Sequence, residues 1–244
     1  MTFCIGIRVR GGLVALADTQ IVRGEEVSSK AKLSLLRHGD RDVFLMTSGL
    51  RSIRDKAVMR LEDELTAANP PHARLYQLVT AFGDQVKRVK AEDGPSLQSS
   101  GMRFDLHAIV GGHLPGDAQP TLFMVYPEGN WVDATPDAPY FVIGRTSYGK
   151  PILDRLLCYD TPLRQAVALA YLAFDATRAS VVDVEFPIDM VVLPIGDGRI
   201  STGRFQAEDL AGAHTFWHEQ LQAALAGFPI EWASALWSGV GGAS

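Results

Sequence analysis

The sequence predicts an α+β fold in which two stacked antiparallel sheets have helices outside them. Predicted strands come in runs and predicted helices come in pairs, whereas a parallel α/β protein would alternate them strictly. Residues 13–17 and, after Asp189, residues 190–193 are apolar on both sides of the strand pleat, as expected for sheets that are covered on both faces. No linker, repeat or low-complexity segment precedes residues 239–244, so residues 1–244 are predicted to form one domain.

Each element is predicted from its pattern of apolar and turn residues. Two glycines, Gly11 and Gly12, separate the first two predicted strands, which is a strong hairpin signal. Strands are predicted over residues 3–9, 13–19, 31–36, 42–47, 103–111, 121–126, 140–144, 188–194 and 199–204. Apolar residues at helical spacing predict helices over about 50–65, 75–89, 149–158, 162–179 and 208–225. Asn69-Pro70-Pro71 ends the first helix, and the Gly, Ser and Pro residues at 92–101 predict a loop.

The composition is that of a globular protein with no preference for nucleic acid or membranes. A formal charge of −5 and a pI near 5.7 disfavour non-specific binding to either. The longest apolar run, residues 166–174, is far shorter than the ~20 residues that a bilayer requires, and the N-terminus lacks signal-peptide features. Cys4 and Cys158 are the only cysteines, which excludes a disulfide framework. We therefore expect a cytoplasmic protein in which Cys4 packs as a small hydrophobe.

Thr2 is the first candidate for catalysis. If a methionine aminopeptidase removes Met1, Thr2 carries a hydroxyl and a free α-amine on one residue. This is the nucleophile-and-base pair of an N-terminal threonine hydrolase. An exposed α-amine titrates at about 7.7–8.0, so part of it is neutral at pH 7–8 and can act as a base.

Two charged residues are predicted to lie beside Thr2. With both glycines in the turn, paired positions of the first hairpin would sum to about 22 or 23, which places Asp18 opposite Cys4 or Ile5. The first of these registers makes Asp18 and Thr2 diagonal neighbours, roughly 7–8 Å apart at Cα. Lys32, predicted on the next strand, would stand between them and favour ionisation of the Thr2 hydroxyl. The alternative is that Asp18 and Lys32 are surface charges at strand ends.

These residues and the motifs around them resemble those of a proteasome β-type subunit. The motifs of the N-terminal half are Thr2, Ala17-Asp18-Thr19, Lys32-Leu33 and Ser48-Gly49. A start of Met-Thr-Phe-Cys without a propeptide, and residues 148–155 and 187–189, are similar to the bacterial Anbu, or ancestral β-subunit, branch. The resemblance extends from Thr2 to about Trp232. It implies a four-layer αββα sandwich of the N-terminal nucleophile hydrolase type.

The resemblance also implies roles for individual residues. Thr2 would be the nucleophile, Asp18 and Lys32 its charge partners, and the Gly49 amide the donor to the oxyanion. Members of the family form rings or open helical assemblies, which implies that copies of this chain associate with one another.

Two motifs depart from the proteasome pattern. The family places a serine in a Gly-Ser-Gly loop, where residues 143–147 of this chain offer Thr146 or Ser147 instead. The family's Asp-x-x-Ser motif appears with its residue types reversed, as Ser180 and Asp183. In the family these groups hydrogen-bond and orient the amine of the nucleophile. The reversal either preserves that network with exchanged roles or weakens catalysis.

Three functions are compatible with these features, and the first is favoured. It is a threonine-type peptidase that cleaves peptides or unfolded proteins through an acyl ester on Thr2 and requires no metal or cofactor. The second is an amidase that uses the same chemistry on a non-peptide amide. The third is a weak or inert assembly subunit. Retention of Met1 would favour this function, because the free amine would then lie one residue away from Thr2. Residues 206–244, including Trp232 and Trp237, are expected to contact other subunits, and the involvement of an unfoldase stays open.

Overall fold

The computed structural model describes residues 2–23, 26–29, 31–67, 72–196 and 198–237, with the backbone alone described for residues 21–23 and 26–29. It divides into two compact units, Met1–Gln206 and Ala207–Ser244. The strands are β1 (Phe3–Val9), β2 (Gly12–Asp18), β3 (Gln20–Arg23), β4 (Glu26–Ser29), β5 (Leu33–His38), β6 (Arg41–Gly49), β7 (Leu106–Gly112), β8 (Thr121–Val125), β9 (Trp131–Asp133), β10 (Tyr140–Gly144), β11 (Ile188–Pro194) and β12 (Ser201–Phe205). The helices of the first unit are α1 (Arg51–Ala67), α2 (Leu75–Ser99), α3 (Lys150–Leu156) and α4 (Leu163–Arg178).

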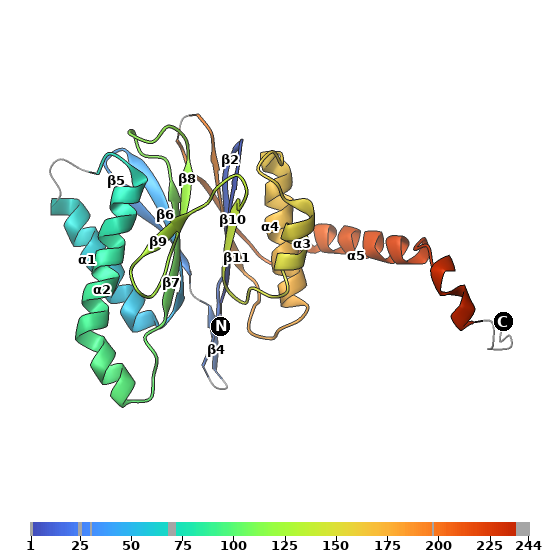
Figure 1. The fold of residues 1–244 in the computed structure, drawn as a ribbon, viewed down its shortest axis with the longest axis horizontal. Helices are drawn as coiled ribbons and strands as arrows, with labels where there is room; N and C mark the ends of the chain where they lie inside the picture. The colour runs from blue at the N-terminus through green and yellow to red at the C-terminus, as the bar shows by residue number, and fades with distance from the viewer. Residues whose placement is uncertain (1, 24–25, 30, 68–71, 197, 238–244) are drawn as a thin grey trace. The chain divides into compact units, whose positions relative to one another are not determined.

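The first unit is a four-layer sandwich (Figure 1). One five-stranded sheet has the order β10-β1-β2-β11-β12, and the other has the order β5-β6-β7-β8-β9. Neighbouring strands in both sheets are antiparallel. Helices α3 and α4 cover the first sheet, and α1 and α2 cover the second (Figure 1). The predicted αββα architecture is therefore confirmed.

Apolar side chains fill the space between the layers. Cys4, Ala15 and Ala17 of the first sheet pack against Phe44, Met46 and Ile109 of the second in one buried cluster. A second cluster lies beneath α1 and α2, where buried residues recur at the three- and four-residue spacing of a helical face. Each fully buried large side chain contributes about 1.5–3 kcal/mol relative to an exposed one. The parts of β1, β2 and β6 that carry these residues are thereby packed between the two sheets.

The loop predicted at residues 92–101 is wrong, because α2 continues through Pro95 to Ser99. The prediction rested on the helix-breaking tendency of Gly94 and Pro95. Contacts with α1 outweigh that tendency. Lys56 pairs with Asp93 at 2.9 Å and Arg60 with Glu92 at 2.9 Å, while Leu97 packs against the core cluster.

The first hairpin also differs from both predicted registers. Cys4 pairs with Ala17 and Val9 with Gly12, so that paired positions sum to 21. Gly12 belongs to β2 rather than to the turn, which shifts Asp18 to the position opposite Phe3. Lys32 precedes β5 instead of lying within a strand. The β3–β4 hairpin and strand β9 were not predicted.

The second unit is mostly helical. It contains the short 3₁₀ helices η1 (Glu208–Leu210) and η2 (Glu231–Leu236) on either side of α5 (Ala211–Ala226). No residue of α5 is buried. None of the helices in the described residues is long and apolar enough to cross a membrane.

Candidate active site

The peptide bond between Thr2 and Phe3 is held at both of its polar groups. The Thr2 carbonyl oxygen accepts a hydrogen bond from the Arg145 backbone N–H at 2.8 Å. The Phe3 N–H donates to Asp18 Oδ1 at 2.7 Å. Because these partners come from opposite neighbours of β1, namely the end of β10 and the end of β2, they fix the orientation of Thr2 at the start of the strand.

Gly144 permits this approach of the backbone to Thr2. Its φ is +89°, in the region that favours glycine. A Cβ at this position would lie 1.8 Å from the Thr2 carbonyl oxygen. The contact between Thr2 and the end of β10 therefore requires glycine at position 144.

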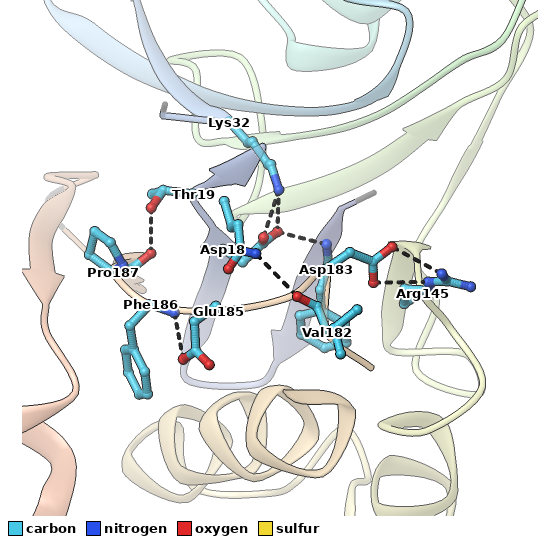
Figure 2. A network of polar contacts seen from close by, with 11 residues as sticks. Asp18, Thr19, Lys32, Arg145, Val182, Asp183, Glu185, Phe186 and Pro187 are labelled. Atoms are coloured by element: carbon cyan, nitrogen blue, oxygen red, sulfur yellow. Dashed lines mark hydrogen bonds and ion pairs between the residues drawn. The ribbon is translucent and has the colours of Figure 1, made fainter. Parts of the chain in front are cut away.

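Asp18 and Lys32 form a buried ion pair beside this peptide (Figure 2). Lys32 Nζ donates to Asp18 Oδ1 at 2.7 Å and to Oδ2 at 2.6 Å. The two side chains are 7% and 0% exposed. Burial raises the pKa of Asp18, and the charge and hydrogen bonds of Lys32 oppose that rise. The structure thus brings Thr2, Asp18 and Lys32 together, and it excludes the alternative in which the two charges lie at the surface.

Backbone pairing places Gly49 near Lys32. The Thr47 N–H donates to the Lys32 carbonyl oxygen at 3.3 Å, and Gly49 follows two residues later at the end of β6. N–H groups two residues apart on a strand point to the same side. The Gly49 N–H is therefore directed to the side of β6 on which Lys32 lies.

The structure reveals a second ion pair that the sequence reasoning missed. Arg145 donates to Asp183 through Nε at 3.3 Å and through Nη2 at 2.9 Å (Figure 2). Burial, the largest influence, tends to raise the pKa of Asp183, but the bonds and charge of Arg145 and the charge of the N-terminal amine together hold the pKa below its usual value. The available signal was that Arg145 and Asp183 both occupy segments that depart from the proteasome pattern.

The remaining predicted hydroxyl groups have other surroundings. Ser180 follows α4, and its exposed hydroxyl donates to the carbonyl oxygen of Ala176 in that helix at 3.0 Å. Thr146 and Ser147 are exposed in the turn before α3. Thr146 lines a cavity of about 420 Å³ along β10 and α3, together with Tyr140 and Lys150.

Cys4 is fully buried, as predicted. Burial raises the pKa of its thiol, and the nearby Asp18 carboxylate raises it further. A thiol in this state is a poor nucleophile. Thr2 is therefore the better candidate at the start of the chain.

A cavity of about 180 Å³ adjoins the site on the side of the second sheet. Thr47, whose N–H binds the Lys32 carbonyl, is part of its wall. The other lining residues are Ser34, Leu45, Arg54, Asp55, Val58 and Met59. This wall combines apolar side chains with the charged Arg54–Asp55 pair, which is separated by 2.8 Å.

An αββα sandwich with a threonine at the start of its first strand, held beside a buried lysine–aspartate pair, defines a protein of the N-terminal nucleophile hydrolase class. The model of the proteasome subunit family matches residues 2–193. The chain therefore belongs to the proteasome subunit family.

Solved structures of Anbu proteins match nearly the whole chain. A mutant Anbu from Hyphomicrobium sp. strain MC1 is 30% identical, with a TM-score of 0.84 over 94% of this chain and 98% of that chain. Anbu, the ancestral β-subunit, from Yersinia bercovieri is 29% identical, with a TM-score of 0.82 over 93% and 97%. The Anbu complex from Pseudomonas aeruginosa, described as a helical assembly, is 27% identical, with a TM-score of 0.85 over 93% and 97%. A comparison with curated proteins finds no match. The predicted resemblance to the Anbu branch is confirmed.

Proposed function

We propose that this chain is a threonine-type peptidase whose nucleophile is Thr2 after removal of Met1. The observation that carries the proposal is the arrangement at the start of β1, where the Thr2–Phe3 peptide is held next to the buried Asp18–Lys32 pair. Membership of the proteasome subunit family supports hydrolase chemistry of the N-terminal nucleophile kind.

In the proposed mechanism, the terminal amine accepts the hydroxyl proton of Thr2, directly or through a water molecule. Thr2 Oγ forms a bond to the carbonyl carbon of the substrate, and the Gly49 N–H donates to the resulting oxyanion. The ammonium returns the proton to the leaving nitrogen as the C–N bond breaks, which leaves an acyl ester on Thr2. Water then attacks the ester carbon with the amine again as base. The acyl C–Oγ bond breaks, the ammonium returns the proton to Thr2 Oγ, and the acid product leaves.

Lys32 would supply a fixed positive charge to this reaction. Its ammonium group is almost fully buried, and a charge interacts more strongly in a dry site than in water. It would therefore favour the alkoxide form of Thr2, while the hydrogen bonds to Asp18 hold Lys32 in place.

The cavity of 180 Å³ would receive the substrate side chain next to the scissile bond. Leu45, Val58 and Met59 would provide apolar contacts to that side chain, and the Arg54–Asp55 ion pair forms a charged part of the cavity wall. We expect medium-sized uncharged side chains at this position of the substrate, because an unpaired charge would be desolvated there.

Intact-mass measurement after incubation with an epoxyketone peptide tests the proposal, because this reagent bonds to both the hydroxyl and the free amine of a terminal threonine. We expect a mass that lacks Met1 and carries one adduct, and no adduct in Thr2→Ala. Thr19→Ala is the matched control and keeps the adduct, since the Thr19 hydroxyl donates to the Pro187 carbonyl instead. Retained Met1, or a processed chain that never reacts, would instead support an inert assembly subunit. A processed chain that takes the adduct but cleaves no peptide would support the amidase.

We also propose that copies of this chain associate through residues 206–244. The supporting observation is that α5 and η2 expose large apolar side chains, which monomeric proteins rarely leave in water. These are Phe216, Leu221, Leu225, Trp232 and Leu236. The helical assembly of the Pseudomonas aeruginosa Anbu complex is a precedent.

The two free cysteines fit the reducing cytoplasm, where we expect the protein to act.

A further inference from the structure

Arg145 contacts both Thr2, the proposed nucleophile, and the largely buried carboxylate of Asp183. Its backbone N–H donates to the Thr2 carbonyl oxygen at 2.8 Å. Its guanidinium group donates to Asp183 through Nε at 3.3 Å and Nη2 at 2.9 Å. Two parallel bonds fix a planar guanidinium in orientation as well as in distance. Arg145 therefore ties the end of β10, where Thr2 is held, to the segment that follows α4.

The terminal amine of processed Thr2 would lie within the electrostatic range of this pair. The nitrogen and the carbonyl oxygen of Thr2 belong to one residue, so the amine is within roughly 7 Å of the Arg145 N–H. The side chains of Arg145 and Asp183 are 35% and 12% exposed, and partly buried charges are screened less than surface charges. The charge of the N-terminal amine is among the causes that lower the pKa of Asp183, so the charges of this pair should in turn influence the amine.

Other charged groups near this end of β1 are already paired with one another. Asp18 of β2 is bound to Lys32, which precedes β5. Near the end of α4, Arg178 contacts Asp175 at 3.7 Å and Glu185 at 3.4 Å. Arg145 differs from these groups because its own backbone also holds Thr2.

We infer that Arg145 is a positioning residue for Thr2 and, together with Asp183, sets the proton affinity of the terminal amine. The inference rests on the proposed role of that amine as the catalytic base. A carboxylate alone would favour the ammonium form, which cannot accept the Thr2 proton. The guanidinium compensates for this charge, so the pair orders the site while part of the amine stays neutral near pH 7–8.

The test is a titration of the terminal amine in the full chain processed to begin at Thr2. The rate of amine acetylation by acetic anhydride is followed against pH by mass spectrometry of the N-terminal peptide, which requires no catalysis. We expect Asp183→Asn to lower the midpoint by about 0.5 pH unit or more and Arg145→Gln to raise it by a similar amount. Arg145→Lys keeps the charge and should restore most of the wild-type value.

Arg10→Gln is the matched control, because Arg10 pairs with Asp160 at 2.6 Å beyond the opposite end of β1. It should leave the midpoint unchanged. Shifts of the same sign in Asp183→Asn and Arg145→Gln, or no shift in either, would overturn the inference. The epoxyketone reaction is measured in parallel. If wild-type protein takes no adduct, the peptidase proposal fails, while the two opposed shifts still decide the role of Arg145.

Discussion

At the scale of single residues, the decisive feature is that Lys32 and Asp18 are buried as a pair. Two charges removed from water are tolerated only when they are close and their remaining hydrogen-bonding groups are satisfied. Asp18 meets this condition by accepting hydrogen bonds from Lys32 and from the Phe3 N–H. The pair also joins the two sheets, because Asp18 ends β2 and Lys32 lies beside Thr47 of β6.

Removal of one partner should therefore be costly. We expect Lys32→Met to lower the free energy of unfolding by about 3–5 kcal/mol, because it leaves the Asp18 carboxylate buried without its partner. The double variant Lys32→Met/Asp18→Leu should recover much of this loss. Lys90→Met is the control, since Lys90 pairs with Glu128 at 3.3 Å at the surface, and should change stability by about 0–1 kcal/mol. Urea unfolding of the four proteins measures these differences, and equal losses in Lys32→Met and Lys90→Met would contradict the argument.

Residue types identified part of the site, and backbone geometry supplied the rest. Thr2, Asp18 and Lys32 were predicted because the chemistry of each side chain indicates its role. Arg145 was not, because its contact with Thr2 is made by a backbone N–H that any residue except proline could offer. Its side-chain partner, Asp183, lies 38 positions away in the sequence.

At the scale of elements, pairing between β1 and β10 determines where Thr2 sits. Phe3 pairs with Gly144. Thr2 and Arg145, which lie just outside these two strand ends, are joined by the hydrogen bond from the Arg145 N–H to the Thr2 carbonyl oxygen. The sequence predicted both strands, but their adjacency is a contact between distant segments that periodicity does not encode. The predicted register of the β1–β2 hairpin was wrong for a related reason. The pairing of Val9 with Gly12 decided it, and composition did not reveal which of two adjacent glycines lies in the turn.

The β1–β10 contact can be tested at Gly144. A Cβ in Gly144→Ala would lie 1.8 Å from the Thr2 carbonyl oxygen, so β10 must move away from Thr2. Gly39→Ala is the matched control, because Gly39 also has a positive φ, +62°, but has open space where the Cβ would go.

We expect Gly39→Ala to cost about 1 kcal/mol of unfolding free energy from backbone strain alone. Gly144→Ala should cost roughly 2 kcal/mol more and should also slow adduct formation at Thr2 at least tenfold. Denaturant unfolding and intact-mass kinetics give the two quantities. Similar values for both variants would show that the approach of β10 does not position Thr2.

At the scale of the whole molecule, the two units differ in how they treat their apolar residues. The unit Met1–Gln206 encloses large buried clusters between its layers. In the second unit, α5 buries none of its residues and has Glu219 as its only acidic or basic residue besides two histidines. A helix with so little charge gains little from water and is stabilised mainly by packing. Self-association offers that packing without a further partner.

We therefore expect apolar side chains on one face of α5 to control assembly. Leu221 and Leu225 are four residues apart and are 50% and 77% exposed, so they lie on the same face of the helix. We expect the full chain with Leu221→Ser and Leu225→Ser to sediment as a smaller species than the wild type at equal concentration. Its adduct formation at Thr2 should be retained, because the site residues lie within Met1–Gln206. Gln220→Ser, an exposed polar position on the same helix, is the control and should sediment like the wild type. An unchanged sedimentation coefficient in the double leucine variant would mean that assembly uses surfaces of the sandwich instead.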